Sequence, residues 1–222
     1  MHLVNSVVGF MQEGGFFMFP ILLVLALGLA IAVERFIYLN NTKTANIETW
    51  DEMLPLIEKG RFSEAASAAA NSNAAVGKIL AYGLSRLNAT RQRADIETAM
   101  EEGLMEIVPR LEKRTHYLAT FANISTLLGL LGTVTGLIEA FAAVSHADPA
   151  QKAELLSASI SVAMNCTAFG LGSAIPMMLL YSFLQSKTTE LVDSLEMVSV
   201  KFLNMLQEHP SQKRSNKDGS DT

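Results

Sequence analysis

Charged residues are scarce in this chain. Asp, Glu, Lys and Arg make up 18% of its 222 residues, whereas a soluble domain usually carries about 25%. Residues of the hydrophobic class account for 50%. The formal net charge is −5, and no stretch forms the basic stripe that would neutralise the phosphates of a nucleic acid. The composition favours a membrane protein and argues against a nucleic-acid partner.

Cysteine and histidine are also few. Cys166 has no second cysteine with which to form an internal disulfide, and His2, His116, His146 and His209 lack the spacing of metal ligands. The sequence contains no nucleophile with a base and an orienting group, no glycine loop for phosphates and no paired carboxylates in a pocket pattern. We therefore expect no enzyme, no cofactor and no resident metal.

Three long runs contain no charged residue: Phe16–Val33, Thr115–Ile138 and Leu155–Ser186. A bilayer core about 30 Å thick needs roughly 20 apolar residues in a helix, and a backbone in lipid must satisfy its own hydrogen bonds. Length disfavours the alternative of buried helices in a soluble protein. The runs predict an all-α membrane protein with three transmembrane helices.

The charges and turn signals set the predicted boundaries. They give an external N-terminus (1–15), transmembrane helix 1 (16–39), a cytoplasmic helical segment (40–114), transmembrane helix 2 (115–144), an external loop (145–154), transmembrane helix 3 (155–186), a cytoplasmic helix (187–208) and a disordered tail (209–222). The N-terminus has no basic leader or small-residue cleavage site, so we expect the first span to be retained.

The basic residues predict the orientation. None of the 17 Lys and Arg residues lies in the first fifteen positions, and only Lys152 lies in the loop 145–154. The others lie between Arg35 and Arg114 or after Ser186. By the positive-inside rule, the N-terminus is outside and the C-terminus is cytoplasmic.

Two cytoplasmic stretches carry apolar residues at helical spacing. The second and third helices are therefore expected to extend into the cytoplasm, the second without a strong break and with Pro109 as a kink. We expect that a single chain cannot bury these stripes, which favours an assembly of identical subunits. The residues are Ile96, Met100, Leu104, Ile107 and Leu111 before the second span, and Leu191, Leu195, Val198, Phe202 and Met205 after the third.

Small and hydroxyl-bearing residues are concentrated in the second span. Gly129, Gly132 and Gly136 give a face on which another helix backbone can approach closely. Thr133 and Thr135 carry hydroxyls that can bond back to their own helix or line an ion path.

The third span has a similar narrow face. Ser159, Thr167 and Gly170 lie on it, whereas Asn165 is about 200° around the helix from Thr167 and faces elsewhere, at a subunit interface for example. The two small faces predict either a shared pore or a groove that receives a helix of another protein.

Charged residues near the span ends have simpler interpretations. Two interpretations of Glu139 have equal weight: a rim group at the outer mouth of a channel, and a residue of a solvated helix end. Glu34 and Arg35, at the cytoplasmic end of the first span, are expected to anchor that helix at the headgroups.

The motifs resemble those of the MotA/TolQ/ExbB family. LLGLLGTVTG at 127–136 resembles the second-span signature of the TolQ/ExbB branch, and AFGL at 168–171 with AIP at 174–176 resembles its third-span signature. Glu34-Arg35 followed by Tyr38-Leu39 also fits the family pattern, as do the topology and the cytoplasmic segment between the first two spans. The resemblance therefore covers nearly the whole chain up to about residue 206. Three spans favour TolQ/ExbB over the four-span MotA branch.

The resemblance implies a stator subunit of an ion-driven motor in the bacterial inner membrane. Five such subunits would surround two copies of an ExbD/TolR/MotB-like partner, which has one membrane helix bearing an aspartate. A TonB-like protein and membrane lipid are further expected partners, and the motor would energise envelope or outer-membrane transport. The resemblance implies that Thr133 and Thr167 are the pore-lining hydroxyls near the aspartate of the partner. From the residues themselves, the predicted ion path also includes Asn165, Thr135 and Ser159, and the predicted packing residues are Gly129, Gly132, Gly136, Gly170 and Pro176.

One position departs from the family pattern. Val162 stands where proton-driven ExbB and TolQ proteins usually place a glutamate. The transported ion is H⁺ or Na⁺, with a lean to sodium, because hydroxyl, amide and carbonyl oxygens suit a hard cation bound transiently near Thr133 and Thr167. Two alternatives stay open: a non-conducting membrane scaffold of the same fold, and an unrelated transporter or membrane enzyme.

Overall fold

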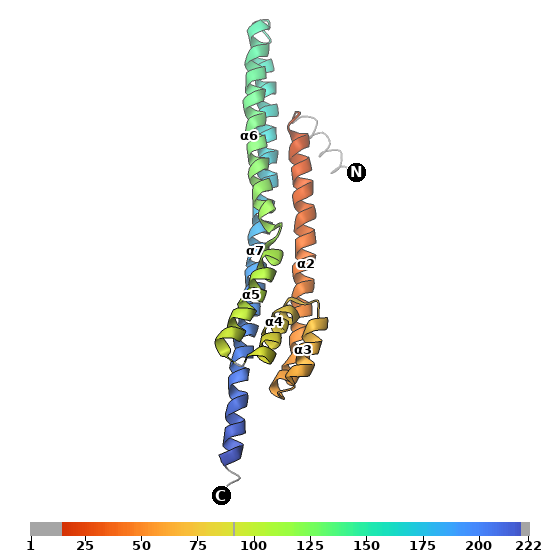
Figure 1. Cartoon of the computed structure of the whole chain (residues 1–222). Helices are drawn as coiled ribbons and strands as arrows, with labels where there is room; N and C mark the ends of the chain where they lie inside the picture. The colour runs from red at the N-terminus through yellow and green to blue at the C-terminus, as the bar shows by residue number, and fades with distance from the viewer. Residues whose placement is uncertain (1–14, 91, 219–222) are drawn as a thin grey trace, which may run out of the picture. The chain divides into compact units, whose positions relative to one another are not determined.

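The computed structural model describes the backbone of residues 15–90 and 92–218, and in that part of the chain it contains helices and no strand. The elements are α2 (Met18–Glu58), α3 (Phe62–Asn71), α4 (Ala75–Ala89), α5 (Arg93–Glu112), α6 (Thr115–His146) and α7 (Lys152–Asp218) (Figure 1). The all-α prediction is confirmed. The expected external N-terminus lies outside the described residues except for Gly15.

Three helical stretches are long and apolar enough to cross a bilayer: 18–58, 93–145 and 152–207. This confirms the three-span prediction. The third helix, α7, has 67 residues, whereas a span needs only about 20, so it extends well beyond the bilayer as expected. The N-out, C-in orientation stays a prediction.

The second stretch is interrupted at Lys113 and Arg114. The sequence predicts a kink at Pro109, but Pro109 lies inside α5 and the interruption comes later. Arg114 has a φ of 70°, and a left-handed residue just past a C-cap ends a helix because it turns the chain away from the helical path. Helix α6 then begins at Thr115, the predicted first residue of the span.

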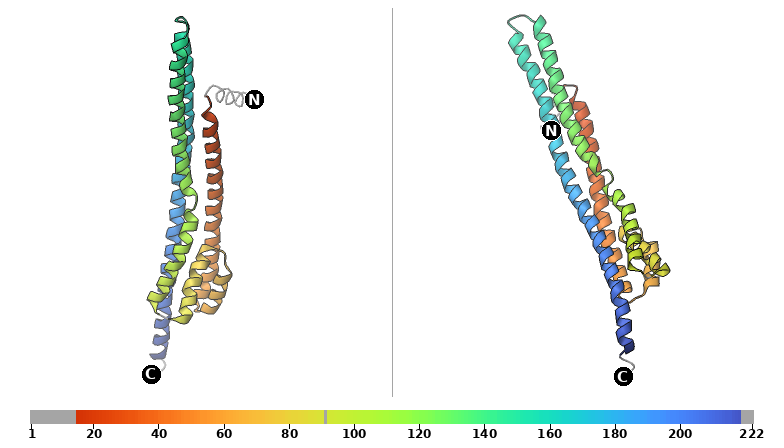
Figure 2. Two further views of the ribbon diagram at one scale, coloured as in Figure 1. Left: turned by 45° about the horizontal axis from the view of Figure 1, so that its top comes forward. Right: turned by 60° about the vertical axis from the view of Figure 1, so that its left-hand side comes forward.

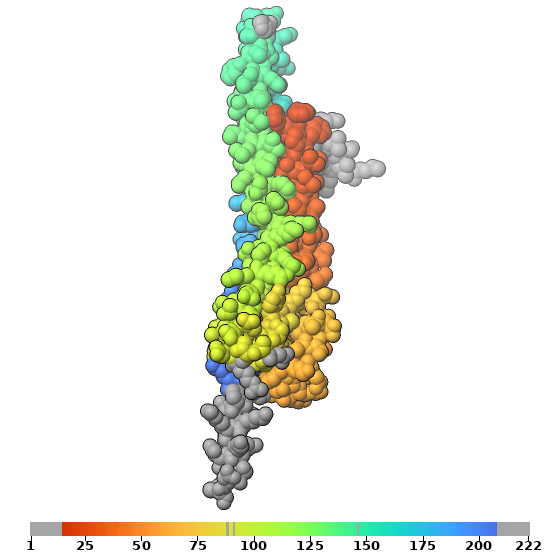
Figure 3. All heavy atoms as spheres, in the orientation of Figure 1, coloured from red at the N-terminus to blue at the C-terminus, as the bar shows by residue number. Residues whose placement is uncertain are grey.

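The chain divides into two compact units, of which the first contains residues 15–35 and 114–184. Here α2 and α6 run side by side (Figure 3), and Ala122, Ala174 and Met177 form a buried cluster. A Cβ atom added to Gly170 would lie 2.8 Å from the carbonyl oxygen of Ser125 and 2.9 Å from Cα of Gly129. The backbones of α6 and α7 are therefore in direct contact.

The second unit contains residues 36–113 and 185–218. Helix α4 packs against both α3 and α5, and α3 lies beside the C-terminal part of α2 (Figures 1 and 2). Helix α7 contacts α4 and α5, because Phe202 lies beside Gly83 and Asn204 accepts a hydrogen bond from Arg93. Both apolar stripes predicted for this region point into its core. The buried members are Ile96, Met100, Ile107, Leu111, Leu191, Leu195 and Phe202. The expectation that one chain cannot bury these stripes is wrong, because both are buried within the single chain, where α4 packs on them through Gly83, which lies against Met100 and Phe202.

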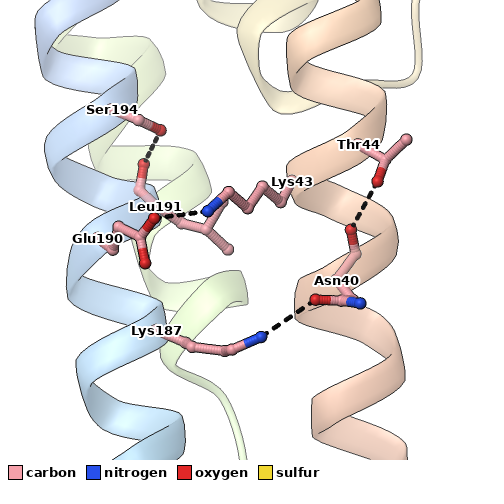
Figure 4. A network of polar contacts seen from close by, with 7 residues as sticks. All are labelled: Asn40, Lys43, Thr44, Lys187, Glu190, Leu191 and Ser194. Carbon is pink, nitrogen blue, oxygen red and sulfur yellow. Dashed lines mark hydrogen bonds and ion pairs between the residues drawn. The ribbon is translucent and has the colours of Figure 1, made fainter.

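Polar contacts at the surface of the second unit join α2 to α7 (Figure 4). Lys43 Nζ lies 2.6 Å from Glu190 Oε1, and Lys187 Nζ donates to Asn40 Oδ1 at 3.1 Å. The hydrogen bond from Lys43 lowers the pKa of Glu190. Because these groups are exposed, solvent screens the pairs and they add little stability.

Helix α7 ends at Asp218, whereas the sequence predicts a helix only to residue 208. The predicted disorder of the tail is not tested by a helical backbone and stays a prediction.

The contact between α6 and α7 gives a first prediction. Gly170→Ala should destabilise the protein by about 1–3 kcal/mol, because the new methyl group would collide with backbone atoms that cannot move without separating the helices. The melting temperature in detergent, followed by circular dichroism, measures the loss. Gly172→Ala is the matched control, since a Cβ atom there meets nothing within 4 Å. Equal melting temperatures for the two variants would contradict the close contact.

Candidate functional site

The hydroxyls of Thr133 and Thr167 meet between α6 and α7. Each threonine is half-buried, and the two hydroxyls hydrogen-bond to each other. Thr167 Oγ1 also donates to the carbonyl oxygen of Gly129 at 3.0 Å, and Thr133 Oγ1 lies 3.2 Å from the same oxygen. The carbonyl oxygen of Ala163 lies 3.4 Å from Thr133 Oγ1. Two hydroxyls and two carbonyls from both helices thus form one cluster of oxygen atoms.

Glycines allow this cluster to form. A Cβ atom on Gly129 would lie 3.3 Å from Cα of Thr167, and one on Gly132 would overlap the Sγ atom of Cys166. Because neither residue has a side chain, α7 comes close enough for the Thr167 hydroxyl to reach a carbonyl on α6. Interfaces between membrane helices use small residues for this purpose.

The small faces of the two spans pack on each other. At Gly136 a Cβ atom would lie 2.9 Å from Cβ of Ala163, which extends the contact one turn beyond the threonines. The sequence left open a shared pore or a groove for a foreign helix. Since each face is covered by the other within one chain, the small faces themselves give no argument for a ring of subunits. Pro176, the remaining predicted packing residue, is exposed.

Three predicted ion-path residues lie outside the cluster. Thr135 Oγ1 bonds to carbonyl oxygens of its own helix, those of Leu131 at 3.0 Å and Gly132 at 3.1 Å. Ser159 and Asn165 are half-buried on α7, and no hydrogen bond joins either to Thr133 or Thr167 in the described part of the chain. The structure therefore brings together two of the five predicted residues.

Two buried serines were not among the predicted site residues. Ser125 is fully buried and its Oγ atom donates to the carbonyl oxygen of Gly170 at 3.3 Å. Ser173 is 2% exposed, and its hydroxyl has no hydrogen-bond partner among the described residues. Their spacing was the available signal, because Ser125 lies four residues before Gly129 and Ser173 three after Gly170.

Arg35 is not a headgroup anchor. It is 3% exposed, and its Nε atom donates to the hydroxyl of Thr115 at 3.3 Å. Its neighbour Glu34 pairs with Arg114 at 3.5 Å. These contacts join α2 to the first turn of α6, directly after the left-handed Arg114. A guanidinium removed from water requires polar partners, so this position is part of the packing rather than of the lipid surface.

Glu139 and Val162 both lie at the surface. Glu139 is exposed on α6, which fits either interpretation given for it from the sequence. Val162 is 37% exposed on α7, so a carboxylate at this position would not be enclosed by its own chain.

The fold and the site define a multi-pass membrane protein whose spans hold hydroxyls and carbonyls in contact. The family model described as "MotA/TolQ/ExbB proton channel family" matches residues 71–197, more than half of the chain and both span motifs. The chain belongs to this family, which is a family of channel proteins and not of known enzymes.

Relatives with assigned names place the chain in the TolQ/ExbB-like branch. A putative biopolymer transport protein ExbB homolog of Methanothermobacter thermautotrophicus is 28% identical over 87% of this chain and 68% of its own length. The biopolymer transport protein ExbB of Aquifex aeolicus is 32% identical over 50% of this chain and 72% of its own length. The Tol-Pal system protein TolQ of Haemophilus influenzae is 38% identical over 38% of this chain and 36% of its own length.

The oxygen cluster gives a second prediction. Thr133→Val and Thr167→Val keep the side-chain shape and remove a hydroxyl. If the hydroxyls solvate an ion or a charged group, each change should lower ion-driven transport roughly tenfold or more, because a hydrogen bond to a charged group contributes about 1.5–3 kcal/mol. Ion flux through the assembled protein in proteoliposomes measures the transport.

Thr126→Val is the matched control for this pair. Thr126 is half-buried on the same helix, but within the described part of the chain its hydroxyl bonds only to the carbonyl oxygen of Ala122 in its own helix. Full ion flux through both cluster variants, with normal assembly, would exclude the cluster from the ion path.

Proposed function

We propose that this protein is the channel-forming stator subunit of an ion-driven motor in the bacterial inner membrane. It works with a single-span partner of the ExbD/TolR type and energises transport at the cell envelope. The observation that carries this proposal is the cluster at Thr133 and Thr167, in which hydroxyl and carbonyl oxygens are gathered between two apolar spans. Such oxygens have no use toward lipid, and they can solvate an ion or a carboxyl group.

The moving charge has to come from the partner. The acidic residue of α6, Glu139, is exposed and near the predicted outer end of its span. On α7, the position where a carboxylate is expected holds Val162, which does not titrate. A charge at mid-bilayer costs about 2.5–3.5 kcal/mol even on the lenient insertion scale. A partner helix bearing an aspartate therefore needs shelter, which a ring of five copies of this chain provides.

The outer surface of the first unit suits a ring in lipid. Large apolar side chains on α6 and α7 are exposed in the single chain, including Leu127, Ile138 and Leu179 with exposures of 63, 64 and 68%. Apolar surface of this kind faces lipid or a neighbouring copy. Ring formation thus rests on these lipid-level side chains and not on the glycine faces, which are already covered.

Sodium is the favoured ion in this proposal, and protons are the alternative. The cluster consists of neutral oxygens, which are the ligands that hard cations prefer, and it contains no group that titrates near neutral pH. A proton would instead have to pass between water molecules and the aspartate of the partner. Whether the ion is sodium or a proton, its binding neutralises the charge of the partner's carboxylate.

A non-conducting scaffold of the same fold is the second candidate. The observation in its favour is that the hydroxyls of Thr133 and Thr167 are already engaged with each other and with carbonyls. In that case their function is to hold α6 to α7. Ion flux through the assembled complex distinguishes the two candidates.

The division of labour gives a third prediction. Changing the membrane aspartate of the partner to asparagine should abolish ion flux and motor output while leaving the complex assembled, because the neutral amide carries no charge that a bound ion could neutralise. Flux is measured in proteoliposomes and assembly by native mass spectrometry. Selective flux from this chain reconstituted without any partner would refute the division of labour.

The choice of ion gives a fourth prediction. With a cluster of neutral oxygens, motor output should fall when external sodium is replaced by potassium at constant membrane potential, and it should change little between pH 6.5 and pH 8, roughly, where the cluster has no group to titrate. Output is followed by the driven uptake reaction. Output that is insensitive to sodium but varies with pH would identify protons as the coupling ion.

A further inference from the structure

A cleft of about 360 Å³ opens within the second unit, where α2, α4 and α5 meet. Tyr38 lines it from α2, Lys78 from α4 and Arg110 from α5, and the described residues of its wall all belong to this unit. Small-molecule sites have volumes of roughly 300–1,000 Å³, so the cleft is large enough for a small ligand. Neither Thr133 nor Thr167 lines it, and none of the roles proposed above uses it.

The charge of the cleft has one sign. Lys78 and Arg110 are basic, and none of the described residues that line it is acidic, although the whole chain has a net charge of −5. Arg110 also pairs with Glu106 at 2.7 Å, but a guanidinium has five N–H donors and keeps others available. Lys78 has no ion-pair partner among the described residues. The cleft is therefore suited to an anion.

The N-terminus of α4 adds backbone donors to the same wall. Ala74 and Ala75 line the cleft, and the first N–H groups of a helix carry partial positive charge. The N–H group of Ala74 donates to Ser72 Oγ at 3.2 Å. That of Val76 donates to Asn46 Oδ1, also at 3.2 Å. The N–H group of Ala75, between them, has no hydrogen-bond partner within the described part of the chain. Helix N-termini of this kind bind phosphate groups.

A side-chain donor beside this terminus also lacks a partner. Asn46 is 4% exposed, and its Nδ2 atom makes no hydrogen bond to any described residue. Its Oδ1 atom holds the N–H group of Val76, and its neighbour Ala45 lines the cleft. A buried donor without a partner is costly. The amide and the α4 terminus thus both favour an occupant that brings hydrogen-bond acceptors.

We infer that this cleft binds a small soluble phosphate monoester, with Lys78 and Arg110 on the phosphate oxygens. A phosphate monoester carries a charge of about −1.5 to −2 at pH 7 and three strong acceptor oxygens. It therefore matches two cations and several donors better than a carboxylate with a single charge does. Ile107 and Leu111 also line the cleft, and such apolar walls suit the organic part of an ester. The ligand can enter from water, because Asn73 and Arg110 are exposed.

Binding of phenyl phosphate to the purified full-length chain in dodecyl maltoside, followed by phosphorus NMR, tests the inference. The wild type should bind the probe saturably. Lys78→Gln with Arg110→Gln should raise the apparent Kd about tenfold or more, because charge-assisted hydrogen bonds are lost. Lys59→Gln with Arg86→Gln is the matched control, because it removes two exposed charges of the same unit that do not line the cleft. This control should bind the probe as tightly as the wild type.

Further arms separate the possible results. Lys78→Arg with Arg110→Lys keeps both charges and should keep most of the binding, which excludes misfolding as the cause of the loss in the glutamine variant. Benzoate, with one charge, should bind more weakly than phenyl phosphate.

Three results would overturn the inference. The first is equal affinity of the wild type and the glutamine variant, or no saturable binding by the wild type. The second is a loss in the charge-keeping variant as large as that in the glutamine variant. The third is tighter binding of a triglutamate peptide than of phenyl phosphate, which would assign the cleft to an acidic protein segment.

Discussion

The direct contact between the backbones of α6 and α7 is the constraint on which the candidate site depends. In lipid, a hydroxyl without a partner is costly, and the threonines find partners because Gly129 and Gly170 let the two helices touch. Ser125 uses the same contact to reach the carbonyl of Gly170. One packing feature thus provides both helix association and the gathering of oxygen atoms on which the proposed ion path rests.

The two units of the chain solve different burial problems. The spans are apolar around most of their circumference, so packing between them relies on small residues and van der Waals contact rather than on removing apolar surface from water. In the second unit the helices are amphipathic, and Ile96, Leu195 and Phe202 are buried as in a soluble protein. The same two helices, α2 and α7, take part in both units, and their composition changes along their length accordingly.

Several charged groups of this chain hold its structure or line a cleft. Arg35 is buried against Thr115, Glu34 pairs with Arg114, and Lys78 and Arg110 line a cleft of their own. The oxygen cluster, by contrast, is neutral. A channel subunit with this distribution supplies the solvation of a charge but not the charge itself, which is why the proposed function needs a second protein.

The sequence by itself determined the three spans and the amphipathic stripes, because the length of an uncharged run and the spacing of apolar residues are local properties. It also indicated Thr133 and Thr167, through their place beside the glycines. Only the tertiary structure decided what covers each face: the small faces cover each other, α4 helps to bury the stripes, and Arg35 packs inside. It likewise placed the interruption at Arg114 instead of Pro109, since a left-handed non-glycine residue leaves no mark in the sequence. A periodicity defines a face, and only the folded chain defines its partner.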